Sequence, residues 1–392
     1  MSNVGGRLGL IRMTGRDAEQ SHRVASPLEL FFDLVFVVAV SQASQNLHHG
    51  IAEGHAADSV LSYVMVFFAI WWAWMNFTWF ASAFDTDDWL YRVMTIVQMG
   101  GVLVLASGVH DAMVEGRWEL VTWGYVIMRL AMVGQWLRLA VSDPEQRPVA
   151  IRYAVGITCV QAIWVARIAL SAEVQFWTFF PAMLLELLVP FLAERARKTP
   201  WHPHHIAERY SLFTLIVLGE SLLASSNAII DAQNSGNSHE GLATLAVAGI
   251  VLAAGMWWLY FSLDQGERLR SSQASFFFGY AHYFVFAAAG AVSAGIEVEL
   301  DLLTHSADHL SASAASLALT IPVTVFLLGV WVVLLRSRLT AVSSVLFLAS
   351  AGFVLASAAF PTATILGTAV GVIFAVAVTE RHRVQEREAN RS

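Results

Sequence analysis

The sequence predicts an all-α, polytopic membrane helix bundle with about twelve transmembrane helices. Hydrophobic residues make up 57% of the 392-residue chain and charged residues only 14%, whereas an ordinary soluble domain is about one quarter charged. Apolar runs recur from end to end, and each is roughly 20 residues long, the length that crosses a bilayer core. Lys and Arg gather in alternate connections between these runs. Buried helices of a large soluble protein would instead alternate with amphipathic helices, which are rare in this sequence.

The bulk composition also excludes several classes of function. The net charge of −7 provides no basic surface for nucleic acid, and the sequence has no phosphate-binding loop or nucleotide fingerprint. A single cysteine, Cys159, excludes an internal disulfide framework, and we predict no cofactor. Residues 1–25 are polar and lack the apolar core and cleavage site of a signal peptide, so we expect the first apolar segment to be retained.

Six spans are predicted in the first half of the chain. The first begins after Ser26 and Pro27, residues that favour the start of a helix, and the second is rich in tryptophan. The next three are apolar runs between polar connections, and the sixth contains Pro181 and Pro190, which imply kinks. The six spans are 28–47, 60–80, 91–110, 118–140, 149–171 and 173–193.

Six further spans are predicted in the second half of the chain. The tenth and the last two are rich in Ala, Val and Leu and are unambiguous by hydropathy. The break between the last two depends mainly on Pro361 and on the total length, so ten or eleven spans are alternatives to twelve. The six spans are 208–230, 242–263, 275–295, 313–335, 340–358 and 360–379.

The distribution of basic residues predicts the topology. If the N-terminus is cytoplasmic, nearly all of the 23 Lys and Arg residues fall in the two tails and in cytoplasmic loops. Arg117 falls in an outside loop, and Arg129 and Arg167 fall within spans. We therefore expect a multi-pass inner-membrane protein with both termini in the cytoplasm. The largest outside connections, around 231–241 and 296–312, are too short for a folded domain, so the membrane bundle itself must carry the function.

The sequence also indicates an internal duplication into two six-helix halves. "LELFFDLVFVVAVSQAS" and "AERYSLFTLIVLGESLLAS" align so that Glu29 matches Glu208, and "FFAIWWAWMNF" resembles "LAAGMWWLYF" in the following spans. The alternative is that Trp-rich apolar stretches match by composition alone. Duplicated bundles often bind their ligand at the interface of the repeats. The expected organisation is a cytoplasmic tail (1–25), a first repeat (26–194), a cytoplasmic linker (195–207), a second repeat (208–379) and a cytoplasmic tail (380–392).

Two acids lie in the first turns of the first span. Glu29 and Asp33 are four residues apart and therefore share one face of a helix. The electropositive start of the helix favours carboxylates, and this alternative explains Glu29 well. It explains Asp33 less well, because Asp33 lies about 6 Å deeper along the helix. We therefore consider both acids candidates for an ion-binding or substrate-binding site.

Three further charged residues lie near the middle of predicted spans, where ionisable groups are costly. Glu220 is flanked by Gly219 and Ser221, small residues that admit another helix or water. Glu186 lies in the proline-containing sixth span. Arg129 requires a buried acid partner, for which Glu186 and Glu220 are the candidates. The alternative role for these residues is a buried ion pair that only holds the bundle together.

Histidine and tryptophan give weaker signals. His282 lies at membrane depth between two tyrosines and is a candidate site residue, although a hydrogen-bonded helix contact is the alternative. The tryptophans of the second and eighth spans fit interface anchors or packing. Three histidines in the loop "TPWHPHHIAER" could contact a transition metal, but no Cys or HExxH motif completes a site, and we predict no metal.

Two motifs resemble one family. "SPLELFFDLVFVVAVSQ" and "HHIAERYSLFTLIVLGESLLA" resemble the bacterial low temperature requirement A (LtrA) family, and the resemblance covers about residues 26–379. It implies a multi-pass membrane protein linked to growth in the cold, without an agreed biochemical activity. Its motif acids correspond to Glu29, Asp33, Glu208 and Glu220, and the resemblance assigns them no role.

Three functions are compatible with the sequence. The first is a secondary transporter or permease, in which Asp33 and Glu220 bind a cation or proton and Arg129 is a switchable partner. The second is an intramembrane enzyme or lipid-handling protein, and the third is a non-catalytic membrane sensor or scaffold. The expected partners are the lipid bilayer and a small solute, cation or proton.

Overall fold

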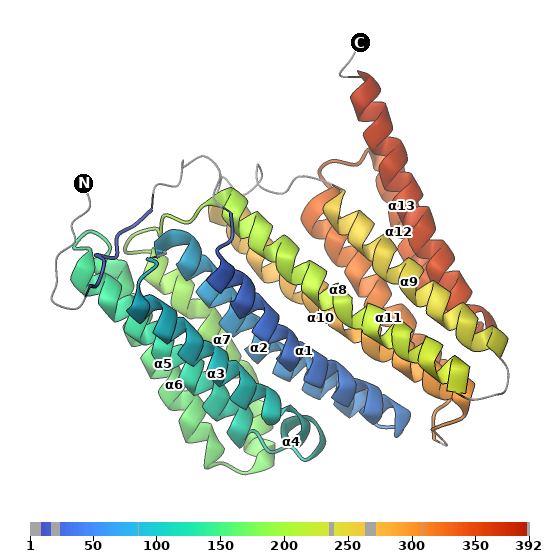
Figure 1. Ribbon diagram of the computed structural model, residues 1–392, viewed down its shortest axis with the longest axis horizontal. Coiled ribbons are helices and arrows are strands. Elements are labelled where there is room, and N and C mark those ends of the chain that lie inside the picture. The colour runs from blue at the N-terminus through green and yellow to red at the C-terminus, as the bar shows by residue number, and fades with distance from the viewer. Residues whose placement is uncertain are drawn as a thin grey trace. The chain divides into compact units, whose positions relative to one another are not determined.

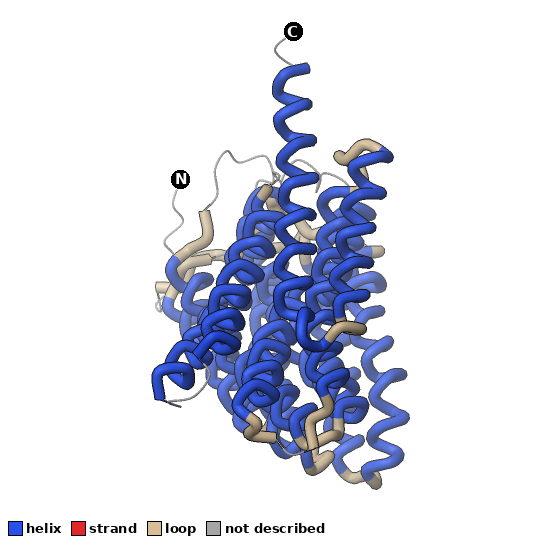
Figure 2. Tube along the Cα trace, turned by 90° about the vertical axis from the view of Figure 1, so that its right-hand side faces the viewer, coloured by secondary structure: helices blue, strands red, loops and turns tan. Residues whose placement is uncertain are grey.

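The computed structural model describes residues 9–16, 24–84, 86–234, 239–262, 272–307 and 309–389 (Figure 1). In this part of the chain the structure is all-α, with helices joined by short loops and no strand (Figure 2). The predicted fold class, a polytopic helix bundle, is therefore confirmed. A helix satisfies its own backbone hydrogen bonds, which a chain this apolar needs because lipid offers no replacement donors or acceptors.

Thirteen helices are present in the described residues. Twelve are long, and α4 is a short extra turn after α3. Trp331–Leu335 continues α11 as a π-helix, and Pro361–Ala363 forms a 3₁₀ turn. The helices are α1 (Pro27–Ala52), α2 (Ala56–Phe84), α3 (Trp89–Ser107), α4 (Val109–Val114), α5 (Glu119–Ser142), α6 (Arg147–Ile168), α7 (Ala172–Glu194), α8 (Pro203–Asn234), α9 (His239–Phe261), α10 (Ser272–Thr304), α11 (Ala312–Val330), α12 (Ala341–Ser357) and α13 (Thr364–Ala389).

Each of the twelve predicted spans coincides with one long helix. Nine helices of the described chain are long and apolar enough to cross a membrane. The other three are α12, which is apolar but has 17 residues, and α5 and α8, which carry more polar side chains. The number of spans therefore stays a prediction. The break expected at Pro361 is present, because α12 ends at Ser357 and α13 begins at Thr364.

The chain forms two compact units. Unit 1 comprises Met1–Gln42 and Phe68–Arg209, and unit 2 comprises Ala43–Phe67 and Tyr210–Ser392. Three helices, α1, α2 and α8, therefore contribute residues to both units. The predicted division into repeats at 26–194 and 208–379 stays a prediction.

Small residues bring helices close together within each unit. In unit 1, α3 packs on α5 where Gly101 meets Gly124, and a Cβ on Gly124 would lie 2.3 Å from the amide nitrogen of Leu105. In unit 2, α10 packs on α11, and a Cβ on Gly295 would lie 2.5 Å from the carbonyl oxygen of Ala318. Such contacts are typical of membrane helices. The two helix pairs occupy corresponding positions in the predicted repeats, and the duplication itself stays a prediction.

Gly124 provides a test of this packing. We expect Gly124→Ala to destabilise the protein by about 1–3 kcal/mol, because its methyl group would overlap the backbone of α3. The matched control is Gly100→Ala on α3, where a Cβ would meet nothing within 4 Å and the substitution favours the helix by up to about 1 kcal/mol. Thermal unfolding in detergent measures both. Equal effects of the two substitutions would contradict the packing argument.

Candidate functional site: two buried charge clusters

The first turn of α1 is built as predicted from its sequence. The backbone N–H of Ser26 donates to the Glu29 carboxylate at 2.7 Å, and the Glu29 N–H donates to the Ser26 hydroxyl at 3.3 Å. This reciprocal arrangement is a capping box. Capping therefore accounts for the hydrogen bond accepted by Oε2 of Glu29, and Oε1 faces a different partner.

That partner is Arg209 of α8, within unit 1. The guanidinium donates twice to Asp33, from Nε at 3.0 Å and from Nη2 at 2.5 Å, and its Nη1 lies 3.1 Å from Oε1 of Glu29. All three side chains are buried. A bidentate pair of this kind fixes geometry as well as charge. The two acids at the start of α1 are therefore tied to the first turns of α8.

His205 and Trp74 complete this cluster. His205 lies one turn before Arg209 on α8, and its Nε2 is 3.2 Å from Oε1 of Glu29. The indole N–H of Trp74 on α2 donates to Oδ1 of Asp33 at 2.7 Å. We call Glu29, Asp33, His205 and Arg209 the α1–α8 cluster. It contains two carboxylates, one guanidinium and one imidazole, all excluded from solvent.

The second cluster surrounds Glu186 of α7, also within unit 1. Arg129 of α5 donates from Nη2 to Oε2 of Glu186 at 2.9 Å, and both side chains are fully buried. Three neutral donors complete the shell of the carboxylate. They are the indole N–H of Trp72 at 3.0 Å, the amide of Gln161 at 2.8 Å and the indole N–H of Trp164 at 3.2 Å. Arg129 also lies 5.7 Å from the centroid of the Tyr125 ring, a cation–π contact.

One stretch of α2 supplies a donor to each cluster. Trp72 and Trp74 are two residues apart, so they point to nearly opposite sides of the helix at 100° per residue. Trp72 reaches Glu186 and Trp74 reaches Asp33. These tryptophans were predicted to serve as interface anchors or packing, and their role as donors to buried acids was not predicted. The available signal was that each buried acid needs donors, and tryptophan carries one on an otherwise apolar body.

The structure places the predicted residues in two separate clusters rather than one. Arg129 pairs with Glu186, one of its two predicted partners, and not with Asp33. Glu208 and Glu220 of α8 are half-buried, and Glu220 lies about 16 Å along the helix from Arg209. Arg209, at the start of the predicted span 208–230, was not predicted as a site residue, and α8 begins at Pro203 and buries it.

His282 has the environment of a core histidine in unit 2. Its Nδ1 bonds to the carbonyl oxygen of Phe278 at 2.7 Å, and its Nε2 bonds to the Tyr260 hydroxyl at 2.8 Å. Both ring nitrogens are thus engaged, and aromatic rings surround the imidazole. The structure favours the alternative of a hydrogen-bonded helix contact over a ligand-binding group.

In the "TPWHPHHIAER" loop the rings of His202 and His204 lie 5.9 Å apart between centroids. His204 is exposed, whereas the backbone N–H of His202 donates to Ser82 and His205 faces Glu29. No group of three or more His, Cys, Asp or Glu side chains in the described residues has a geometry that could hold a metal ion.

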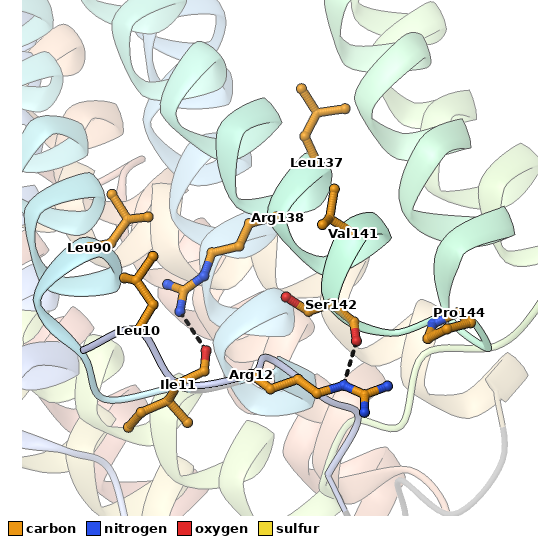
Figure 3. Close-up of a pocket in the computed structure, with 9 residues that line it drawn as sticks. All are labelled: Leu10, Ile11, Arg12, Leu90, Leu137, Arg138, Val141, Ser142 and Pro144. Carbon is orange, nitrogen blue, oxygen red and sulfur yellow. Dashed lines mark hydrogen bonds between the residues drawn. The ribbon is translucent and has the colours of Figure 1, made fainter. Parts of the chain in front are cut away.

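The N-terminal segment 9–16 lies across the ends of α3 and α5 and bounds a cavity of about 870 Å³ (Figure 3). Arg138 donates to the carbonyl oxygen of Ile11 at 2.9 Å, and Arg12 donates to that of Ser142 at 2.6 Å. Asp88 caps α3 and accepts bonds from Arg138, from the Tyr91 N–H and from the Ile11 N–H. This carboxylate therefore attaches the segment to the helices.

A polar pocket of about 380 Å³ lies in unit 2. His48, near the C-terminal end of α1, lies between two acids of α10, with Nε2 2.6 Å from Asp301 and Nδ1 3.3 Å from Glu297. Asn227 of α8 donates to Glu297 at 3.3 Å. These side chains are partly exposed, so water can solvate their charges. Water does not reach the charges of the two buried clusters in this way.

Asp88 generates a pH prediction. Burial raises the pKa of its carboxyl, but the bonds from Arg138, Tyr91 and Ile11 outweigh burial, so the pKa lies below its usual value. The ionised form therefore stabilises the fold above the unfolded-state pKa of about 3.9, and this contribution is lost as the pH falls through the lower folded-state pKa. In thermal unfolding across acidic pH, Asp88→Asn should lose this part of the pH dependence. The exposed control Asp58→Asn should keep it, and a wild-type profile in Asp88→Asn would contradict the argument.

The Arg129–Glu186 pair generates a stability prediction. Arg129→Gln leaves a buried carboxylate without its counter-charge, and we expect a loss of about 3–5 kcal/mol. Arg129→Gln combined with Glu186→Gln removes both charges and keeps one acceptor oxygen in place of the carboxylate, and it should recover part of that loss. A double-mutant cycle of unfolding free energies measures the coupling. Additive effects of the two substitutions would show that the charges do not interact.

Comparison with known proteins agrees with this architecture. Residues 24–379 match the family described as bacterial low temperature requirement A protein (LtrA). The chain is also 27% identical over 275 residues to a protein of Rhizobium meliloti (strain 1021) that is described as uncharacterised, and the match covers 66% of this chain and 65% of that relative. The family match at residues 24–379 spans nearly all of the helices, and the two motifs that carry Glu29, Asp33 and Arg209 lie inside it. The chain therefore belongs to the LtrA family of membrane proteins.

Proposed function

We propose that the protein is a secondary transporter or permease in which the α1–α8 cluster binds and releases a proton. The observation that carries this proposal is the charge count of that cluster. Glu29 and Asp33 provide two negative charges and Arg209 one positive charge, all of them buried. Counted over these four side chains alone, with His205 neutral, the charge is −1, and one added proton on His205 or Glu29 brings that count to zero.

A buried net charge is unfavourable, because the low-dielectric interior does not replace the solvation that water provides. The cluster can lower this cost by taking up a proton or by opening to water. Proton uptake also changes the attraction between α1 and α8, since Arg209 binds both acids. Proton binding would thereby be coupled to the contact between two helices, which is the requirement for a coupled transporter.

The cluster around Glu186 differs from the α1–α8 cluster in its net charge. Arg129 and Glu186 carry equal and opposite charges, and four donors occupy the carboxylate. Proton uptake there would create a net charge rather than remove one. We therefore assign Arg129–Glu186 to the stability of unit 1 and the α1–α8 cluster to coupling.

The transported solute would be small, in keeping with short extramembrane loops and with the polar pocket of unit 2. Glu297 and Asp301 in that pocket are partly exposed and could attract a cation from solution. Glu220 lies farther along α8, the helix that carries Arg209 and His205. We include Glu220 in the proposal as a second acid on the helix that responds to the cluster.

The test is proton flux in proteoliposomes loaded with a pH-sensitive dye under an imposed Na⁺ or K⁺ gradient. Glu29→Gln fixes the cluster close to its neutral state, and we expect proton flux to fall to the level of empty liposomes with unchanged expression and folding. The matched control is Glu173→Gln, an exposed acid in the first turn of α7, which should retain flux. Unchanged flux in Glu29→Gln would refute the coupling role. Glu220→Gln then shows whether coupling extends along α8.

A further inference from the structure

A groove of about 570 Å³ runs between α6 and α7 on the surface of unit 1. Its α6 wall is formed by Ile151, Val155 and Cys159, which recur every four residues and therefore share one face of the helix. Its α7 wall is formed by leucines, of which Leu188 and Leu192 are 45% and 49% exposed. Both helices are long and apolar enough to span a membrane. A molecule bound in this groove would contact apolar side chains on both sides.

Two arginines lie at one end of the groove. Arg152 of α6 donates to the carbonyl oxygen of Leu192 at 3.3 Å, and Arg195 lies 4.6 Å from the centroid of the Phe191 ring. Neither forms an ion pair with any carboxylate of the described residues, so both cations are available to an external anion. The topology predicted from Lys and Arg places this end on the cytoplasmic side.

The nearest acid does not neutralise these arginines. Glu194 at the end of α7 accepts the Thr199 N–H at 3.1 Å, the Thr199 hydroxyl at 2.6 Å and the Tyr153 hydroxyl at 3.3 Å. Its carboxylate is thus directed to the following loop. Arg197 farther along that loop pairs with Glu145. The end of the groove therefore keeps a positive charge from Arg152 and Arg195.

We propose that this groove binds an anionic phospholipid. The acyl chain would lie between the apolar walls, and the phosphate would accept hydrogen bonds from Arg152 and Arg195. The groove wall from Leu185 to Arg195 extends about 15 Å along α7, which is comparable to the depth of one leaflet of a 30 Å core. Basic pockets between membrane helices at the cytoplasmic face select anionic headgroups in this way.

The two arginines distinguish this groove from a purely apolar surface. Exposed apolar side chains are common on both units and by themselves indicate only contact with lipid. A zwitterionic lipid would fill the apolar walls equally well but would gain less from two unpaired arginines. The proposal is independent of the proposed transport function, because it concerns a different face of unit 1.

The native cysteine provides the probe. Cys159 is the single cysteine of the chain, is exposed and lines the groove. A small bimane label on Cys159 would report lipids with brominated acyl chains by quenching. In nanodiscs of phosphatidylcholine, brominated phosphatidylglycerol should quench the label at a lower mole fraction than brominated phosphatidylcholine. Arg152→Gln and Arg195→Gln should each raise the half-quenching fraction of phosphatidylglycerol by roughly fivefold, the contribution of one basic side chain at an anionic surface.

A matched control comes from unit 2. Arg336 is exposed and lies 5.7 Å from the centroid of the Phe277 ring, as Arg195 lies over Phe191, but it does not line this groove. Arg336→Gln should leave quenching unchanged. On unlabelled protein, phosphatidylglycerol should raise the unfolding temperature of the wild type more than that of Arg195→Gln, which removes any effect of the label itself.

Three results would overturn the proposal. Equal quenching by the two brominated lipids would show that the groove does not select charge. A preference that survives both arginine substitutions would place the selecting cations elsewhere. A label that neither lipid quenches would show that protein, such as a second copy of the chain, covers the groove.

Discussion

Burial of charge inside an apolar bundle is the constraint on which the structure of unit 1 depends. Water cannot solvate an ionised side chain there, so each charge needs a counter-charge and hydrogen-bond partners from the protein. Glu186 obtains Arg129 and three neutral donors, and Asp33 obtains Arg209 and Trp74. These partners come from α2, α5, α6 and α8, and the two acids lie on α1 and α7. The two buried carboxylates therefore link six helices through their hydrogen bonds.

The central helix in this arrangement is α2. Its residues 71–77 pack as a buried aromatic segment, and Trp72 and Trp74 donate in nearly opposite directions. An indole is suited to this position because it fills apolar space while offering one N–H. Replacement of either indole by another large apolar ring would preserve volume and leave a buried carboxylate short of a donor. The tryptophans are thus required by the acids and not only by packing.

The sequence predicted the helices well because their determinants are local. Apolar runs, Ser26–Pro27 and Pro361 each act within a few residues, and the corresponding helices begin or end where expected. The acids were identifiable for the same reason, since a carboxylate in an apolar run stands out. Their partners were not, because Arg209 is 176 residues away from Asp33 in the chain. Arg209 lies at the start of the predicted span 208–230, and only the packing of α1 against α8 shows that two buried acids pair with it.

Contacts between residues far apart in the chain also define the two compact units. The six-helix halves could be predicted from the sequence pattern, whereas the compact units could not. The units exchange segments of α1, α2 and α8, and a pattern along the chain does not reveal where a continuous helix changes its neighbours.

The two buried clusters also show why the presence of acids in a membrane span does not by itself identify a functional site. Glu186 and Asp33 are equally buried, and each binds an arginine. What separates them is Glu29, which adds a second negative charge to Arg209, and His205, which can hold a proton beside it. Arg129 and Glu186 carry equal and opposite charges. Under the proposed function, proton uptake by the unbalanced cluster would change the attraction between α1 and α8. Function in such a bundle is therefore better sought where buried charges fail to balance than where they are most deeply placed.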